Sequence, residues 1–147
     1  MNSDTGKIIS LNTSEKKGTI KTPVDRITID ETGIVGDAHA GNWHRQVSLL
    51  PSESIAKVRD QMPELADGAF AENLVTSGVN LGGVRVGDRV SIGDDVLLEV
   101  TQIGKECHNS GCAIKKLTGD CIMPREGIFA KVIREGEIAK ELAIKVI

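Results

Sequence analysis

Residues 104–127, GKECHNSGCAIKKLTGDCIMPREG, contain all three cysteines of the chain and one of its three histidines. The cysteines follow the spacing Cys-x4-Cys-x8-Cys, and a histidine directly follows the first of them. Side chains of these types can bind zinc, form a reactive thiolate, or lie buried as small apolar groups. The three possibilities assign different roles to Cys107, His108, Cys112 and Cys121.

The spacing of these residues does not favour zinc. Structural zinc sites usually take their ligands from close pairs, in which a tight turn brings two sulfurs together. The two cysteine intervals are not those of a standard zinc knuckle, and Cys107 and His108 are neighbours whose side chains tend to point apart. Four soft ligands are nevertheless present. A zinc-binding regulatory or interaction module is therefore the alternative hypothesis, with the ligands Cys107, His108, Cys112 and Cys121.

Cys107 differs from the other two cysteines in its neighbours. It follows a predicted strand, and Lys105 and His108 flank it in the sequence. Nearby cations lower the pKa of a thiol and favour the thiolate, which is the form that attacks electrophiles and binds soft metals. We therefore predict that Cys107 is the reactive group, whereas Cys112 and Cys121 are more typical of small buried side chains.

A second group of candidate residues lies in 33–51, GIVGDAHAGNWHRQVSLLP. Glycines, which permit sharp turns and close approach to a ligand, bracket Asp37, His39, His44 and Arg45. Two histidines near an aspartate can bind a metal, but this spacing is not specific for one. The segment is either a glycine-rich surface loop or a ligand-binding loop in which Arg45 holds an anion, because a guanidinium suits bidentate phosphate contacts.

Two shorter stretches carry weaker signals. In 69–78, AFAENLVTSG, Glu72 and Asn73 are expected to be exposed or bonded to the backbone, with turn stabilisation the favoured role. In 14–21, SEKKGTIK, Lys17 belongs to a basic pair that precedes a glycine. Such a pair can meet a phosphate, although it is more often a solvated hairpin tip.

Composition excludes several classes of protein. A chain of 147 residues fits a single domain, predicted over 1–147, that can bury a core without disulfides or a metal. A net charge of −3 and an aromatic content of 2% argue against a single-stranded nucleic-acid binder, which needs stacking platforms and a basic groove. No apolar run approaches the roughly 20 residues that span a bilayer, and no secretory signal is visible. An odd number of cysteines fits a reducing cytoplasm better than a disulfide framework.

The pattern of apolar residues predicts mainly β-strands. In 84–103, valine, leucine and isoleucine alternate with polar residues, and two Gly-Asp pairs supply turns. One helix is predicted over 52–62, with Ser52 as its N-cap and Pro63 as its end, and a further helical turn at 113–117. Many short strands with glycine turns indicate a closed or nearly closed β-barrel. The other predicted strands are 7–12, 18–22, 24–30, 46–50, 128–133 and 138–147.

Together these motifs resemble those of the MOSC domain family, named after the C-terminal domain of molybdenum cofactor sulfurase. The motifs run in the family's order over about residues 7–138, and they are GIVGDAHAG with HRQVSLLP, FAENL, VGDRVSIGDDVLLEVTQIGKECH and GDCIMPREGIFAKV. The resemblance is greatest to small bacterial stand-alone members. It implies a β-barrel like that of pyruvate kinase, with a few short peripheral helices. It also implies a domain that binds or handles molybdenum cofactor, a pterin that carries molybdenum and a phosphate.

The resemblance further implies roles for individual residues. Cys107 matches the cysteine that binds molybdenum in reductases of N-hydroxylated compounds, and that is proposed to carry sulfur as a persulfide in sulfurases. Arg45 and Asn73 match loop positions near the pterin and its phosphate, and Arg125 matches a segment that closes over the cysteine. The predicted cofactor contacts are therefore Arg45, Asn73, Arg125, His39 and Lys17.

The activity implied is that of a sulfur transferase, a molybdenum-dependent reductase, or a carrier without catalysis of its own. The implied partners are molybdenum cofactor biosynthesis proteins or a cysteine desulfurase, with neither nucleic acid nor membrane. No lysine motif here is assigned to pyridoxal phosphate, so that cofactor is not expected in this chain. Two departures from the family pattern are the extra Cys112 and Cys121, which are either resolving thiols or structural, and Lys140-Glu141, which replaces a Gly-Asp turn.

Overall fold

The fold is taken from a computed structural model. The residues that the structure describes are 5–15, 21–38, 40–41, 43, 45–60, 63, 72–104 and 127–147. Within them the chain forms eleven strands, one α-helix and one short 3₁₀ turn. The mainly-β class predicted from the sequence is therefore confirmed.

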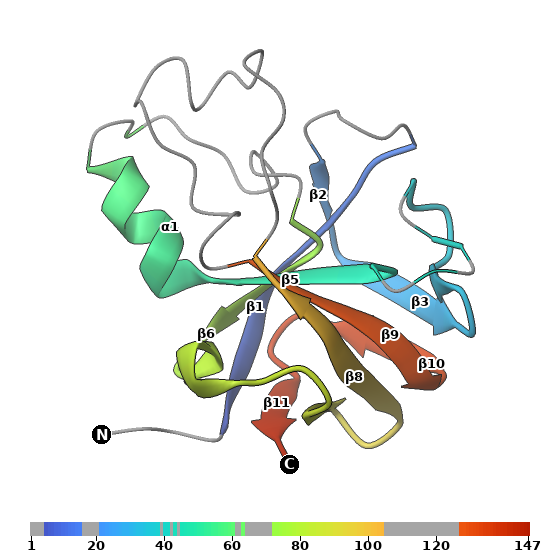
Figure 1. Ribbon diagram of the computed structural model, residues 1–147. Helices are drawn as coiled ribbons and strands as arrows, with labels where there is room; N and C mark the ends of the chain where they lie inside the picture. Colours follow the sequence, from blue (N-terminus) through green and yellow to red (C-terminus); the bar gives the residue numbers. More distant parts are fainter. Residues whose placement is uncertain are drawn as a thin grey trace.

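Seven strands form a closed barrel (Figure 1). Each strand is hydrogen-bonded to the next, and the pairing of the first strand with the last closes the ring. β5 and β6 run parallel, whereas the other neighbours in the ring are antiparallel. The order around the ring is β1 (Thr5–Thr13), β11 (Ala143–Val146), β7 (Arg89–Ile92), β8 (Val96–Ile103), β9 (Ile128–Arg134), β5 (Val47–Pro51) and β6 (Leu74–Ser77).

The other described elements lie around this ring. β2 (Thr22–Val24) pairs with the end of β1. A separate three-stranded sheet has the order β10, β3, β4, and β3 and β10 run along one side of the barrel in Figure 1. The helix α1 packs against β5 and β6. The bounds are β3 (Arg26–Asp30), β4 (Gly33–Ile34), β10 (Gly136–Ala139), α1 (Ser52–Arg59) and the 3₁₀ turn (Leu81–Gly83).

Branched apolar side chains fill the barrel interior. In β8, Val96, Leu98 and Val100 are buried, while Leu97 and Glu99 between them are only partly buried. This alternation follows from the period of two along a strand, and it confirms the predicted pattern there. The same interior cluster takes from the other ring strands Ile8, Leu11, Val47, Leu49, Leu74, Val90, Ile92, Ile128, Ala130 and Ile144.

Most predicted strands are present, with shifted ends. β1, β5 and β9 overlap the predictions at 7–12, 46–50 and 128–133. The strand predicted from residue 84 begins instead at Arg89, because the preceding residues form a turn in which Arg85 N–H donates to Asp88 Oδ2 at 2.9 Å. Of the predictions at 18–22 and 113–117, the structure describes only residues 21 and 22.

The prediction of Ser52 as the helix cap is wrong. β5 runs directly into α1, so the N-cap position is Pro51 in an extended conformation, and Ser52 is the first helical residue. Neither side chain caps the helix. The Glu53 carboxylate instead accepts the N–H of Gly78 at 3.0 Å and so connects α1 to the loop after β6. The helix ends at Arg59, short of the predicted end.

The strands of the C-terminal segment do not pair with each other. β10 pairs with β3, whereas β11 pairs with β7 and β1. The turn between them places Glu141 at a φ of 73°. Its N–H donates to the carbonyl of Ile8 at 2.8 Å, which fixes the turn against β1. The Lys140-Glu141 turn thus forms, although with a conformation that is unfavourable for a residue with a Cβ atom.

Candidate functional site

The candidate residues that the structure describes lie on the outer face of the barrel, around β1, β5 and β9. Val47 and Leu49 of β5 belong to the interior cluster, so Ser48 between them points outward. Phe129 of β9 is opposite Ser48 in the register and lies on the same face. Both Ser48 and Phe129 are buried all the same. This part of the outer face is therefore covered by other parts of the chain.

Arg45 lies just before β5 and is held by two aromatic rings. Its guanidinium carbon is 4.7 Å from the centroid of the Trp43 ring and 5.8 Å from that of Phe129. Both distances are within the range of cation–π attraction. The Arg45 Nε is buried and has no hydrogen-bond partner in the structure as described. A buried donor without an acceptor is unfavourable, so this atom is available to an acceptor from a ligand.

The segment that carries Cys107 leaves and rejoins the barrel beside this arginine. It begins after β8 and ends before β9, and Ile103 pairs with Ile128 across its base. The N–H of Gly104 donates to the carbonyl of Gly127 at 2.7 Å, which closes the base. Phe129, whose ring contacts the Arg45 guanidinium, is only two residues beyond Gly127. Arg45 and the base of this segment are therefore neighbours.

Asn73 is completely buried and bonds to the chain on two sides. Its Oδ1 accepts from the N–H of Ser48 at 3.0 Å and from its hydroxyl at 3.2 Å. Its Nδ2 donates to the carbonyl of Asn12 at 3.0 Å, and its own carbonyl accepts the Asn12 N–H at 2.8 Å. Asn73 thus connects β1 to β5 at the point where β6 begins. The side chain thus bonds to the backbone, as expected from the sequence, but it bridges two strands instead of stabilising a turn, and its contact with a cofactor stays a prediction.

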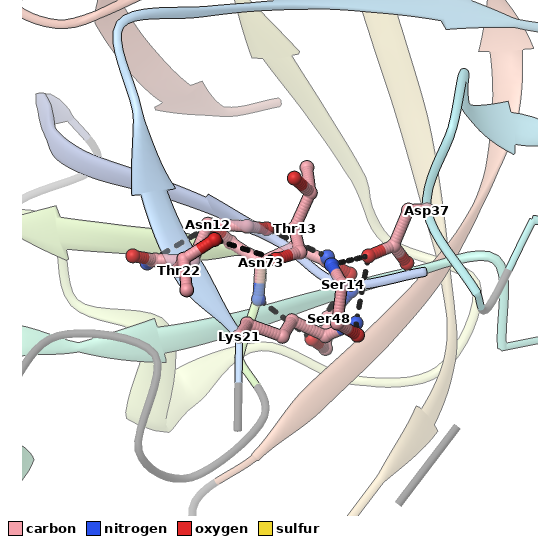
Figure 2. A network of polar contacts seen from close by, with 8 residues as sticks. All are labelled: Asn12, Thr13, Ser14, Lys21, Thr22, Asp37, Ser48 and Asn73. Atoms are coloured by element: carbon pink, nitrogen blue, oxygen red, sulfur yellow. Dashed lines mark hydrogen bonds and ion pairs between the residues drawn. The ribbon is translucent and has the colours of Figure 1, made fainter. Parts of the chain in front are cut away.

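A buried ion pair lies next to this bridge (Figure 2). Lys21 Nζ is 2.7 Å from Asp37 Oδ1, and both side chains are fully inaccessible to solvent. The same Lys21 Nζ lies 3.2 Å from the hydroxyl of Ser14, and Asp37 Oδ1 also accepts the Ser14 N–H at 3.0 Å. Figure 2 shows Lys21 extending toward Asp37 and Ser14, in the same layer of polar contacts as Asn73 and Ser48. The 14–21 and 33–51 motifs are thereby joined.

The base of the loop that carries Asp37 and Arg45 is closed by Gln46. Its Nε2 donates to the carbonyl of Gly41 at 2.8 Å, and its Oε1 accepts the N–H of Val132 at 2.9 Å. Gly33 lies against it with a φ of +122°, and a Cβ atom there would be 3.0 Å from the Gln46 carbonyl oxygen. Glycine at this position is therefore required by both conformation and space.

Only part of the predicted site falls within the described residues. Arg45 and Asn73 are among the described residues, and Ser48 links them. Ser48 bonds to Asn73 on one side and pairs with Phe129 on the other, and the Phe129 ring contacts the Arg45 guanidinium. The candidates that lie outside the described residues are Cys107, His108, Cys112, Cys121, Arg125, His39, His44 and Lys17. Their predicted roles are untested by the structure.

Sequence reasoning did not single out three residues that the structure makes prominent. Lys21 lay inside a predicted strand, where nothing in the sequence indicated a buried ammonium. Trp43 and Phe129 entered the sequence analysis only through the low aromatic content, yet both flank Arg45. The scarcity of aromatic rings was the available signal, because two of only three rings in the chain contact the same guanidinium.

Two features are absent from the described residues. These residues contain no cluster of three or more His, Cys, Asp or Glu side chains that could hold a metal ion. Among them there is also no helix of the length and apolar character needed to cross a membrane. All four residues of the zinc hypothesis lie outside the described part of the chain, so that hypothesis stays open.

Comparison with known proteins places this arrangement in a family. The model of the MOSC domain matches residues 36–145, which include the helix, the strands from β5 to β10 and most of β11. The chain belongs to the MOSC domain family. The resemblance read from the motifs is therefore confirmed, and with it the association of the family with molybdenum cofactor.

Individual relatives agree with this membership. A protein named "Reductase" from Gibberella moniliformis is 32% identical over 120 residues, a match that covers 74% of this MOSC domain chain. The match covers 21% of that protein, so the chain spans about a fifth of its length.

Solved structures share the fold. YuaD from Bacillus subtilis superimposes with a TM-score of 0.80 at 21% identity, covering 97% of this chain and 95% of that one. YiiM from Geobacillus stearothermophilus gives 0.72 at 23% identity, covering 97% and 75% of the two chains. YiiM from Escherichia coli gives 0.63 at 21% identity, covering 96% and 69%. At these identities the similarity establishes the MOSC barrel alone.

Proposed function

We propose that this MOSC domain binds molybdenum cofactor on the outer face of its barrel and acts in the maturation or sulfuration of that cofactor. Arg45 holds an anionic group of the ligand, and Cys107 serves as molybdenum ligand or persulfide carrier. The observation that carries the proposal is the buried, unpartnered Nε of Arg45 between two aromatic rings. Membership in the MOSC family, which is associated with molybdenum cofactor, supports that cofactor as the ligand.

The surroundings of Arg45 suit an anion on a flat ligand. The Trp43 and Phe129 rings restrict the guanidinium plane and so reduce the entropy lost when it binds. A guanidinium can donate two parallel hydrogen bonds to a phosphate, a geometry that a lysine cannot offer. An acceptor placed at Nε would also satisfy a buried donor. The residues present therefore fit the phosphate-bearing pterin of the family.

The position of the Cys107 segment supports a role for its thiol near the same ligand. Both ends of that segment are fixed by the Gly104–Gly127 hydrogen bond, next to Phe129 and the Arg45 guanidinium. A thiolate is a soft donor suited to molybdenum or to a sulfane sulfur. When bound, the cofactor would supply a redox-active metal, while the chain would hold it through Arg45 and Cys107.

The sulfur-carrier form of the proposal requires a partner that supplies sulfur. A cysteine desulfurase or a cofactor biosynthesis protein in the cytoplasm would be that partner. The reductase form is the second candidate, and the observation that favours it is the name of the Gibberella relative, "Reductase". That protein is about five times the length of the matched region. A reductase built on this domain would therefore receive its electrons from a protein region outside the matched part.

Cofactor retention tests the proposal. Wild-type protein, Arg45→Gln and Cys107→Ala are incubated anaerobically with molybdenum cofactor released from a purified molybdoenzyme, and bound molybdenum is measured after gel filtration. Arg89→Gln is the matched control, because Arg89 lies in the barrel wall at β7 and pairs with Glu99 at 3.5 Å. We expect at least about a tenfold loss of retention for both site variants and none for the control. Equal retention by all four proteins would refute the proposal.

Two further measurements separate the forms of the hypothesis. Mass spectrometry after incubation with a cysteine desulfurase and cysteine shows a sulfur adduct on Cys107 if the thiol carries a persulfide. A Cys112→Ser/Cys121→Ser variant keeps that adduct if the extra cysteines are structural. Stoichiometric zinc in protein purified under reducing conditions would instead support the alternative site at Cys107, His108, Cys112 and Cys121.

A further inference from the structure

The buried ion pair between Lys21 and Asp37 joins two connections that are separate in the sequence. We propose that Asp37 is a positioning residue, which uses this pair to lock the β1–β2 connection against the loop that presents Arg45. The lock itself concerns only the contact between these two connections. Its consequence for the ligand rests on the proposed function.

The contacts between the two connections meet at Ser14, Lys21 and Asp37. Ser14 and Lys21 are the first and last residues of the 14–21 connection, so Asp37 holds both of its ends at once. A backbone hydrogen bond reinforces the lock, because Ala38 N–H donates to the carbonyl of Ser14 at 2.7 Å. One carboxylate oxygen thus accepts from an ammonium and from a backbone amide.

Stability alone is a weak explanation for this pair. Removing two charges from water is unfavourable by several kcal/mol per ion, and replacing a buried pair by neutral groups of similar shape is often neutral or stabilising. The Lys21–Asp37 pair is fully inaccessible, so this reasoning applies to it in full. What a charged pair does supply is a defined geometry, because a strong, directional contact forms only when both partners are in place.

The lock acts on the loop that carries Arg45. That loop is fixed at its base by Gln46, which bonds to Gly41 and Val132, and nine residues earlier it is fixed by Asp37. Arg45 is adjacent to the first anchor and lies between the two along the chain. Loss of the Asp37 anchor would leave the loop attached only through its base at Gln46 and through the Gly41 N–H, which donates to Thr32 at 2.8 Å. The guanidinium would then sample a wider range of positions, and a ligand would lose part of its preorganised contact.

The test separates positioning from stability by making the pair neutral on both sides. Asp37→Asn keeps the Oδ1 acceptor for Ser14, and Lys21→Met keeps the shape of the aliphatic chain. Each single variant removes one charge of the buried pair and leaves the other, and we expect the folding equilibrium to shift toward the unfolded state by about a hundredfold or more. The double variant Lys21→Met/Asp37→Asn has no unpaired charge, and we expect most of the stability to return.

Amide hydrogen exchange in the double variant measures directly whether the two connections are still held together. We expect the Ala38 amide, which donates to Ser14, to exchange at least about tenfold faster than in the wild type. The control amide is Val132, which donates to Gln46 Oε1 at 2.9 Å at the base of the loop; its exchange is expected to be unchanged. An unchanged rate at Ala38 would overturn the inference. If the double variant does not fold, Ser14→Ala removes one Lys21 contact and is expected to give a smaller increase at Ala38, and no increase would also overturn it.

Cofactor retention by the same variant then tests the consequence for the ligand. We expect retention to fall by about tenfold although the melting temperature is close to that of the wild type. Full retention together with fast exchange at Ala38 would show a lock without influence on the ligand and would overturn the positioning role. If the wild type itself retains no cofactor, the proposed function fails, while the exchange measurement still decides whether Asp37 locks the two connections.

Discussion

Ser48 and Asn73 are joined by three hydrogen bonds, although they lie on different strand segments of the barrel wall. The Asn73 Oδ1 accepts from both the N–H and the hydroxyl of Ser48, and the Asn73 N–H donates to the Ser48 hydroxyl at 2.9 Å. This exchange begins the parallel contact between β5 and β6, whose ladder starts one residue later with Leu49 and Leu74. The Asn73 side chain therefore belongs both to the candidate site and to the barrel wall.

We predict that Asn73→Ala lowers the free energy of unfolding by about 2–4 kcal/mol, because it leaves the Ser48 N–H and the Asn12 carbonyl without their buried partners. Ser48→Ala is the matched control, since it removes the hydroxyl but keeps the bond from the Ser48 N–H, and a smaller loss is expected. Urea denaturation measures both. A variant of Asn73 with unchanged stability but lost cofactor retention would show that the residue is a ligand contact instead.

Glu141→Gly should stabilise the protein by about 0.5–1 kcal/mol. Glu141 has a φ of 73°, a conformation that glycine adopts without the steric penalty of a Cβ atom. The substitution also removes the ion pair with Lys7, but both partners are mostly exposed, so little is lost. Glu141→Ala loses the ion pair and keeps the strain, so it should not stabilise. A thermal melt of the three proteins checks the order, and equal melting temperatures for Gly and Ala would contradict the explanation.

Thr76→Val is expected to raise the free energy of unfolding by about 1 kcal/mol. The Thr76 side chain is buried in β6, and its Oγ1 has no hydrogen-bond partner in the structure as described. Replacing this hydroxyl by a methyl group removes an unsatisfied polar atom without changing the branched shape. Thr76→Ser retains the hydroxyl and loses the methyl group, so it should destabilise. A Thr76→Val variant that melts below the wild type would indicate that the hydroxyl is bonded after all.

The pKa of Asp30 lies below its ordinary value because Thr32 donates to Oδ1 from its hydroxyl at 2.7 Å and from its N–H at 2.8 Å. A lowered carboxyl pKa contributes stability that is present above the unfolded-state pKa and is lost as the pH falls through the folded-state pKa. We predict that Thr32→Val raises the Asp30 pKa, as followed by an NMR pH titration, whereas Thr32→Ser leaves it low. No difference between the two variants would assign the shift to the backbone bond alone.

The barrel was accessible from the sequence because each strand carries its own pattern. Val96, Leu98 and Val100 recur at every second position, and this local signal is sufficient to indicate which face is buried. The pairing of β1 with β11 and of β10 with β3 was not accessible, because it depends on residues more than a hundred positions apart. The helix start was mistaken because Ser52 is a good cap in isolation, whereas β5 runs straight into the helix.

Only part of the site could be predicted from the sequence, because the rest depends on contacts between distant residues. Arg45 was identified because a guanidinium in a glycine-rich loop is recognisable chemistry. Its contacts with Trp43 and Phe129 required the loop before β5 to meet the start of β9. The burial of Lys21 could not be inferred at all, because a lysine in a short alternating strand is normally solvated, and its pairing with Asp37 joins residues that are distant in the sequence.

The pairing of β1 with β11 also sets a condition on how the chain acquires its structure. Thr5 lies opposite Lys145, so the contact that closes the ring spans 140 residues of sequence. Contacts of such separation lose much chain entropy before they form, and proteins dominated by them fold slowly. During synthesis the first strand must wait for the last to leave the ribosome. Until then one edge of β1 stays unpaired, and the nascent chain is open to association with other strands.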